Sequence, residues 1–210
     1  WWLILDCVSA FGALPLDVAA MPELDAACFT ANKCLEGLPG FGFALARLDR
    51  LAQCRGNARS WSLDLCDVWH NTEVNGWGSM RFTGPVQALL ALDVALERFA
   101  AEGGREARLA RYRANADALH AGVAALGVRP YLDAAEQGPI VVTFHQPAGL
   151  EFDVFLAALA RHGLTISAYW TTEAPTFRVG AIGCVGLPEM ERAIAAIGAA
   201  LREMGLARAA

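Results

Sequence analysis

The sequence contains almost no lysine. Lys33 is the only lysine against sixteen arginines, although lysine is among the commonest residues of average proteins. Arginine can replace lysine where positive charge is sufficient, but its guanidinium does not lose its proton and cannot act as an amine nucleophile. Lys33 is therefore a candidate for amine chemistry. Drift at a surface position is the alternative, and the count alone does not decide between the two.

Long apolar runs are also absent. Hydrophobic residues make up 55% of the 210 residues and the mean hydropathy is +0.33, but no run approaches the ~20 apolar residues of a membrane-spanning helix. The first residues show neither a basic segment nor a cleavage-site pattern, so they do not predict a signal peptide. Because the sequence opens on a strand-like run without a methionine, we expect it to be a fragment that lacks upstream sequence.

Signals for metal or nucleic-acid binding are missing as well. The six cysteines form no CxxC pair and no Cys/His ligand spacing, which argues against zinc; they are Cys7, Cys28, Cys34, Cys54, Cys66 and Cys184. Without a secretion signal they are expected to be reduced thiols of a cytoplasmic protein. The net charge of −5 and the scattered arginines argue against nucleic acid and anionic membranes as partners.

The N-terminal part predicts an open α/β sheet. Continuous apolar runs favour buried strands, the first of them buried on both faces, and Gly103-Gly104 ends a helical apolar pattern. Residues 56–82 are rich in polar and tryptophan side chains without regular spacing, so we expect an irregular segment there. The expected elements are strands at 2–8, 26–31 and 41–46, a short helix at 16–21 and a helix at 85–101.

The C-terminal part predicts a small α+β domain. A strongly helical stretch precedes it, and Pro188 suits the first turn of its last helix. We place the domain division within the helix expected at 105–125, with a large-domain part over 1–110 and a small domain over 111–210. The expected order is helix 105–125, strand 140–144, helix 152–162, strands 164–167 and 177–179, and helix 188–204.

Asp6 and Lys33 follow two successive strand candidates. Ligands of open α/β sheets bind beyond the carboxyl ends of the strands, so both side chains could reach one cofactor. A carboxylate can keep a cationic pyridine nitrogen protonated, and a lysine amine can form an imine. For Asp6 alone, capping of the following turn is the commoner explanation. The pairing with Lys33 favours the functional one.

Arg178 and Thr83 are two further candidates. Arg178 interrupts an apolar strand, where it either extends its side chain to water or binds a carboxylate with both arms of its guanidinium. Thr83 precedes a helix N-terminus, which suits a phosphate. An ordinary helix cap is the alternative for Thr83, and caps are far more frequent than phosphate sites.

Several motifs occur in a fixed order along almost the whole chain. They are Leu3-Ile-Leu-Asp6-Cys-Val-Ser9-Ala-Phe-Gly12, Thr30-Ala-Asn-Lys33-Cys-Leu-Glu-Gly37-Leu-Pro-Gly-Phe-Gly42, Arg59-Ser-Trp-Ser-Leu-Asp64, Arg81-Phe-Thr83-Gly-Pro85 and Phe177-Arg178-Val-Gly-Ala-Ile-Gly183. Together they resemble the class V aminotransferases of pyridoxal 5′-phosphate (PLP) fold type I. The resemblance implies part of a large PLP-binding domain, built on a mostly parallel sheet with helices, followed by a small α+β C-terminal domain.

The resemblance also implies roles for individual residues, with PLP as the cofactor. Lys33 would be the Schiff-base lysine, Asp6 the partner of the pyridinium nitrogen, and Arg178 the clamp on the substrate carboxylate. Ser9 and Thr83 would bind the cofactor, with Thr83 contributed to its phosphate across a homodimer interface.

Within the family the likeness is greatest to members that pass the amino group of 2-aminoethylphosphonate to pyruvate, giving phosphonoacetaldehyde and alanine. Two alternatives remain open. One is another class V activity, of the alanine–glyoxylate or serine type, and the Ala31-Asn32-Lys33-Cys34 context argues against it. The other is an inactive, truncated paralogue that serves as a structural partner, and the retention of Lys33 as the only lysine argues against that.

Overall fold

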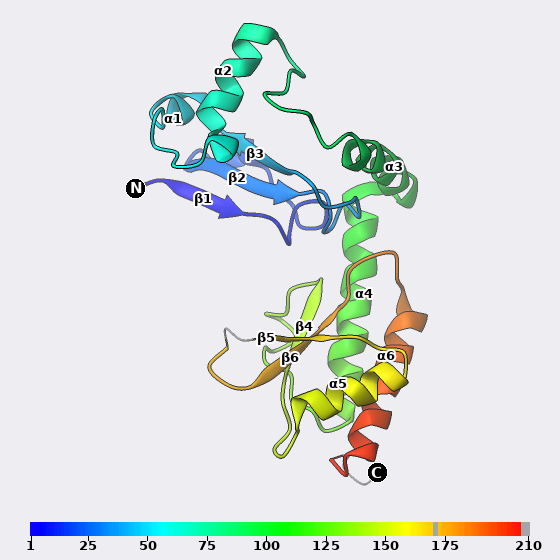
Figure 1. Cartoon of the computed structure of the whole chain (residues 1–210). Coiled ribbons are helices and arrows are strands. Elements are labelled where there is room, and N and C mark those ends of the chain that lie inside the picture. The colour runs from blue at the N-terminus through cyan, green and yellow to red at the C-terminus, as the bar shows by residue number, and fades with distance from the viewer. Residues whose placement is uncertain (170–171, 207–210) are drawn as a thin grey trace. The chain divides into compact units, whose positions relative to one another are not determined.

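A computed structural model describes residues 1–169 and 172–206 (Figure 1). The chain divides into two compact units, Trp1–Glu102 and Gly103–Ala210, and each has its own sheet. The domain division expected between residues 110 and 111 lies inside helix α4, Gly104–Ala125. That division stays a prediction.

The first unit contains a three-stranded sheet in the order β1-β2-β3. The strands are Leu3–Asp6, Leu24–Thr30 and Gly42–Ala46. β1 and β2 are parallel, whereas β2 and β3 are antiparallel. The carboxyl ends of β1 and β2 therefore meet at one edge of the sheet, the edge at which α/β proteins bind ligands.

The core of this unit is built around β2. Phe29 stacks on Phe11 and Phe43, with 3.6 and 4.9 Å between the ring centroids. The prediction that the first strand is buried on both faces is wrong, because Leu3 and Ile4 are 37% and 60% exposed. A strand is buried on both faces only when a layer covers each of them, and the described residues do not provide both layers for β1.

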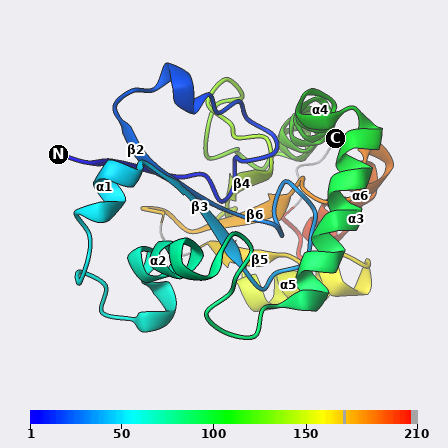
Figure 2. The same ribbon diagram turned by 90° about the horizontal axis from the view of Figure 1, so that it is seen from above.

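Helix α2 corrects the expectation that residues 56–82 are irregular. Asp64 begins this helix by accepting hydrogen bonds from the N–H groups of Cys66 and Asp67, and Gly76 ends it with a φ of 88°. No residue of α2 is fully buried, so its sequence lacks the apolar stripe that marks a helix. The helices of this unit are α1 Leu48–Ala52, α2 Leu65–Asn75, α3 Val86–Glu102 and the 3-10 turns Val18–Ala20 and Trp61–Leu63. α1 and α2 contact each other (Figure 2).

The second unit has the α+β order expected from the sequence. Its three-stranded sheet is antiparallel, in the order β4-β6-β5. The elements are α4, β4 Val141–His145, α5 Phe152–Arg161, β5 Ser167–Tyr169, β6 Thr176–Gly180 and α6 Leu187–Glu203. Across residues 1–169 and 172–206, no helix is both long and apolar enough to cross a bilayer.

The strand expected at 164–167 begins later, at Ser167. Gly163 has a φ of 76°, and the N–H of Leu164 donates to the carbonyl of Leu159 at 3.0 Å. This left-handed glycine with a backward hydrogen bond is a common helix ending. Leu164 therefore belongs to the end of α5 rather than to the sheet.

Three fully buried phenylalanines form the centre of the second unit. The ring of Phe177 on β6 lies 5.5 Å from that of Phe144 on β4 and 5.3 Å from that of Phe155 on α5, between centroids. α4 and α6 also pack closely, because Gly122 leaves no room for a Cβ beside Ile194. Helices and sheet thus share one apolar core.

Polar groups of α4 bind the chain that leaves β6. Asn115 is 1% exposed, and its amide donates to the carbonyls of Ala181 and Val185 at 3.2 and 3.1 Å. Arg111 donates to the carbonyls of Gly183 and Val185. Buried carbonyls need such donors, so α4 fixes the exit of the strand that carries Arg178.

An ion-pair cluster joins the last turns of α5 and α6. Glu203 accepts hydrogen bonds from Arg161 at 2.5 Å and from His162 at 2.7 Å. The hydrogen bond from Arg161, and to a smaller extent that from His162, lowers the pKa of Glu203. A carboxyl whose pKa is lowered by folding stabilises the folded state at pH values above its pKa in the unfolded chain, about 4.3 for glutamate. This contribution is lost as the pH falls through the lower pKa of the folded state.

We therefore expect Glu203→Gln to lower the thermal unfolding temperature at pH 7 and to change it little near pH 2. Unfolding followed by circular dichroism at both pH values is the measurement. Glu191→Gln is the matched control, because Glu191 lies on the same helix, is exposed and forms no ion pair with a described residue. Equal effects of Glu203→Gln at the two pH values would contradict the expectation.

Candidate functional site

β1 and β2, the strands that lead to Asp6 and Lys33, run side by side in parallel (Figure 1). Asp6 is the last residue of β1 and lies opposite Cys28 in the parallel register. β2 ends at Thr30, and Lys33 follows in the turn behind it. The sequence expectation that the two residues stand at the ends of neighbouring strands is thus confirmed, while their roles stay predictions.

Two contacts join the loops that carry these residues. The thiol of Cys34, next to Lys33, donates to the carbonyl of Ser9 at 3.5 Å. Gly12 has a φ of 92°, which favours glycine, and a Cβ there would lie 2.8 Å from Cδ2 of Leu35, so a larger residue would force the Leu35 side chain to move. Side chains on either loop are therefore held in the same neighbourhood by contacts that the sequence did not reveal.

Asp6 caps its own turn and keeps one oxygen available. Its Oδ1 accepts the N–H of Val8 at 2.9 Å, which is the capping role considered from the sequence. Within the described part of the chain, its other carboxylate oxygen accepts no hydrogen bond and the side chain is exposed. Burial and then the charge of Asp6 raise the pKa of the neighbouring Cys7 thiol. Capping of the turn and a role toward a cofactor are therefore compatible for Asp6, because the cap uses only Oδ1.

Lys33 lies in a tight, hydrogen-bonded turn. Its carbonyl accepts the N–H of Glu36 at 3.0 Å, and the N–H of Gly37 donates to the carbonyl of Ala31 at 2.8 Å. Glu36 has a φ of 59°, an uncommon conformation for a side-chain-bearing residue. The Lys33 side chain is half-buried, and its amine makes no hydrogen bond or ion pair with residues 1–169 or 172–206. The turn thus presents an amine that the described part of the chain leaves without a partner.

Thr83 does not cap the helix that follows it. It is exposed and lies three residues ahead of α3, outside any helix or strand, and its hydroxyl has no hydrogen-bond partner among the residues described. The turn after Lys33 approaches the start of this helix, because a Cβ on Gly40 would lie 3.2 Å from Ala88 and 3.8 Å from Pro85. The alternative of a plain N-cap for Thr83 is wrong.

Ser9 and Arg178 complete the predicted set. Ser9 is exposed and contributes its carbonyl to Cys34. Arg178 lies on the exposed face of β6, opposite Thr143 of β4, between the buried side chains of Phe177 and Val179. Four of the predicted residues thus belong to the first unit and Arg178 to the second.

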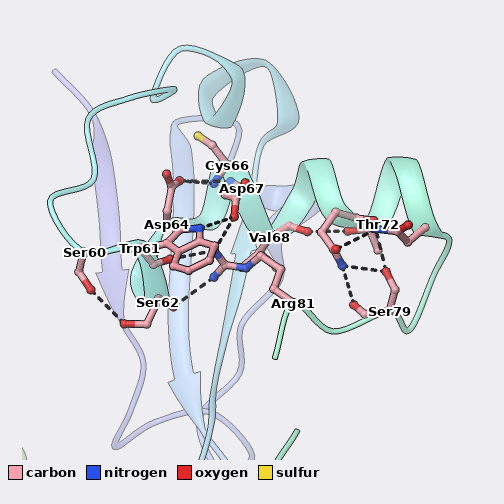
Figure 3. Close-up of polar contacts among 12 residues, drawn as sticks. Ser60, Trp61, Ser62, Asp64, Cys66, Asp67, Val68, Thr72, Ser79 and Arg81 are labelled. Atoms are coloured by element: carbon pink, nitrogen blue, oxygen red, sulfur yellow. Dashed lines mark hydrogen bonds and ion pairs between the residues drawn. The ribbon is translucent and has the colours of Figure 1, made fainter. Parts of the chain in front are cut away.

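The sequence did not predict a polar cluster that joins Arg81, two residues before Thr83, to Asp67 and Trp61 (Figure 3). The side chain of Arg81, 9% exposed, lies 2.7 Å from Oδ2 of Asp67, and the indole N–H of Trp61 donates to the same oxygen at 3.0 Å. The hydrogen bond from Arg81, and then that from Trp61, lowers the pKa of Asp67. The only sequence signal for this cluster is that Arg81 lies two residues before Thr83, because Asp67 is fourteen residues away from Arg81 in the sequence.

Comparison with known proteins adds sequence relatives. No family model matches the chain. It is 44% identical over 207 residues to the 2-aminoethylphosphonate–pyruvate transaminase of Cupriavidus necator, covering 97% of this chain and 54% of the relative. It is also 44% identical over 208 residues to the Burkholderia pseudomallei protein of the same name, covering 98% and 55%. The chain spans about half the length of the curated relatives it matches.

Solved structures share the fold. Pyridoxamine–pyruvate aminotransferase from Mesorhizobium loti matches with a TM-score of 0.83 and 27% identity over 97% of this chain and 53% of that chain. Alanine–glyoxylate aminotransferase from Nostoc sp. matches with a TM-score of 0.81 and 22% identity over 96% and 54%. The second likeness shows the fold alone. The chain has the fold of the corresponding part of PLP fold type I aminotransferases.

Proposed function

Because the chain is homologous over almost its whole length to about half of a 2-aminoethylphosphonate–pyruvate transaminase, a class V aminotransferase, we propose that it forms the corresponding part of a PLP-dependent transaminase. The proposed reaction passes the amino group of 2-aminoethylphosphonate to pyruvate, giving phosphonoacetaldehyde and alanine. The observation that supports the proposal is that β1 and β2 are parallel neighbours, with Asp6 as the last residue of β1 and Lys33 three residues after the end of β2.

The residues at this edge fit PLP. The cofactor needs an amine for its aldehyde carbon, an anion for its ring nitrogen and donors for its phosphate. Lys33 offers an amine without a partner among the described residues, Asp6 offers one free carboxylate oxygen, and Thr83 offers an exposed hydroxyl. Within residues 1–169 and 172–206, the fold uses none of these three groups for a contact of its own, which supports the assignment.

The proposed chemistry divides between the residues. PLP, when bound, supplies a protonated ring that withdraws electrons from the substrate carbon. Asp6 would hold the proton on the ring nitrogen through its carboxylate charge. Nζ of Lys33 would hold the cofactor and, once displaced by substrate, take the proton from the carbon that bears the amino group. Arg178 would bind the carboxylate of pyruvate through its planar guanidinium.

We also propose a homodimer in which Thr83 reaches the cofactor phosphate of the second subunit. One face of α3 supports a partner, since Val86, Leu90 and Val94 recur every four residues and are 54%, 64% and 48% exposed. Exposed apolar stripes of this kind mark association surfaces. The six cysteines are all free thiols, which supports a cytoplasmic location.

Trapping of the cofactor tests the proposal. The chain is incubated with PLP, reduced with borohydride, digested and mapped by mass spectrometry. We expect the label on the peptide that contains Lys33. A label confined to the α-amino group, or no label, would contradict it. Half-reaction spectra with 2-aminoethylphosphonate, alanine and serine then identify the amino donor, and a faster reaction with alanine or serine would reject the proposed substrate.

Asp6→Asn separates the turn-capping role of Asp6 from its charge. Asparagine retains the oxygen that accepts the N–H of Val8 but cannot hold the ring nitrogen protonated. We expect kcat to fall roughly 10- to 150-fold, the equivalent of one lost charged hydrogen bond, with an unchanged unfolding temperature. Steady-state kinetics and thermal melting are the measurements.

Asp17→Asn is the control for this substitution. Asp17 likewise accepts backbone N–H groups, those of Ala19 and Ala20, in a turn of the same unit. We expect it to leave kcat unchanged. A wild-type kcat in Asp6→Asn would exclude the proposed role of the Asp6 charge.

A further inference from the structure

One face of α2 holds the segment that leads to Thr83. Asp67, Asn71 and Asn75 are four residues apart, and such residues share one side of a helix. Asn71 donates to the carbonyl and hydroxyl of Ser79 at 3.2 and 2.9 Å, and Asn75 donates to Asn71 at 3.0 Å. The chain that returns from the end of α2 is thus fastened to the side of the same helix (Figure 3).

Arg81 is the second and stronger attachment. Besides Asp67, its guanidinium reaches the carbonyl of Trp61 at 2.8 Å and that of Ser62 at 3.3 Å. Three acceptors from two separate segments therefore surround one nearly buried cation. Charge-assisted hydrogen bonds of this kind fix position more firmly than neutral ones.

Aromatic contacts extend the attachment to the residue before Thr83. The ring of Phe82 meets that of Trp61 edge to face, 5.1 Å between centroids, and the Arg81 guanidinium lies 5.3 Å from the centre of the Phe82 ring. Ser79, Arg81 and Phe82 are thus each held by side-chain contacts. Thr83 follows directly; it is exposed, and its hydroxyl has no partner in the part of the chain that the structure describes.

We propose that Arg81, through its ion pair with Asp67, is a positioning residue that holds Thr83 ready to donate to the phosphate of the cofactor. This inference rests on the proposed function. Ordering a loop costs conformational entropy, and a loop that is ordered before the ligand arrives does not incur that cost on binding. Arg81 acts through the chain and does not itself contact the cofactor.

Hydrogen–deuterium exchange tests the ordering without any cofactor. Arg81→Ala is expected to speed exchange of the amides of residues 79–84 by at least about tenfold, since it removes a charged group with several hydrogen bonds. Asp67→Asn should give a smaller increase in the same peptide and retains the shape of the side chain, so it serves if Arg81→Ala does not fold. Unchanged exchange in both variants would overturn the proposal.

Arg50→Ala is the matched control. It removes another arginine–aspartate pair of the first unit, Arg50 with Asp25 at 2.8 Å, which has no atom in residues 76–84. Exchange in residues 79–84 should remain as in the unaltered chain. An equal acceleration in this control would show general loosening of the unit and would overturn the specific role of Arg81.

Comparison of PLP with pyridoxal, which lacks the phosphate, tests the link to the cofactor. We expect Arg81→Ala to weaken PLP binding at least about tenfold, as expected for a lost charge-assisted contact, and to leave pyridoxal binding unchanged. Equal weakening of both would overturn the phosphate role. If the unaltered chain bound neither compound, the proposed function and the phosphate role would both fail, while the exchange result would still decide whether Arg81 orders the segment.

Discussion

Replacement of Lys33 by alanine or arginine is expected to abolish covalent attachment of PLP and the visible absorbance of the lysine-bound cofactor. The chain has no second lysine, so no neighbouring side-chain amine can replace it. Arginine preserves the positive charge but does not lose its proton and cannot form the imine. The expected loss is therefore complete for both substitutions, and titration with PLP followed by absorbance spectroscopy measures it.

Both Lys33 variants are expected to fold. Nζ of Lys33 takes part in no hydrogen bond or ion pair with any residue of the described ranges, and the turn is held by backbone bonds of Ala31, Glu36 and Gly37. Circular dichroism should therefore match that of the unaltered chain. Persistence of the absorbance in Lys33→Arg would reject Lys33 as the attachment site.

Replacement of Arg178 by alanine is expected to lower kcat/KM for pyruvate roughly 30- to 5000-fold. This corresponds to a loss of ~2–5 kcal/mol of transition-state stabilisation, the cost of removing one partner of a hydrogen-bonded charge pair. KM should rise more than kcat falls, because the lost contact binds the part of pyruvate that does not react. Steady-state kinetics at varied pyruvate concentration is the measurement.

Two further variants separate the shape of Arg178 from its charge. Arg178→Lys preserves the charge but loses the planar two-armed fork, so it should recover only part of the loss. Arg192→Ala removes an exposed arginine of the same unit, paired with Glu189, and should leave the kinetics unchanged. An unchanged KM for pyruvate in Arg178→Ala would remove Arg178 from the proposed carboxylate clamp.

The spacing of apolar residues was sufficient to predict helices and strands where the apolar side chains are also buried in the fold. The strand, helix, strand, strand, helix order of the second unit follows from apolar side chains such as Phe144, Phe155 and Phe177, which are fully buried. Where side chains are little buried, the spacing of apolar residues did not predict the structure. α2 carries polar side chains and no fully buried residue, so its sequence shows no helical apolar pattern. β1 is largely apolar in sequence, although three of its four residues are exposed.

The sequence by itself determined the candidates: a single amine at Lys33, an acid at a strand end, and an order of motifs that identified the fold class. Only the tertiary structure decided that β1 and β2 are parallel neighbours, that Cys34 bonds to Ser9, and that Arg81 pairs with Asp67. The physical reason is the separation in sequence between the residues that interact. Propensity, capping and hydrophobic period act between residues a few positions apart, whereas these contacts join residues at least fourteen positions apart, which only the tertiary fold brings together.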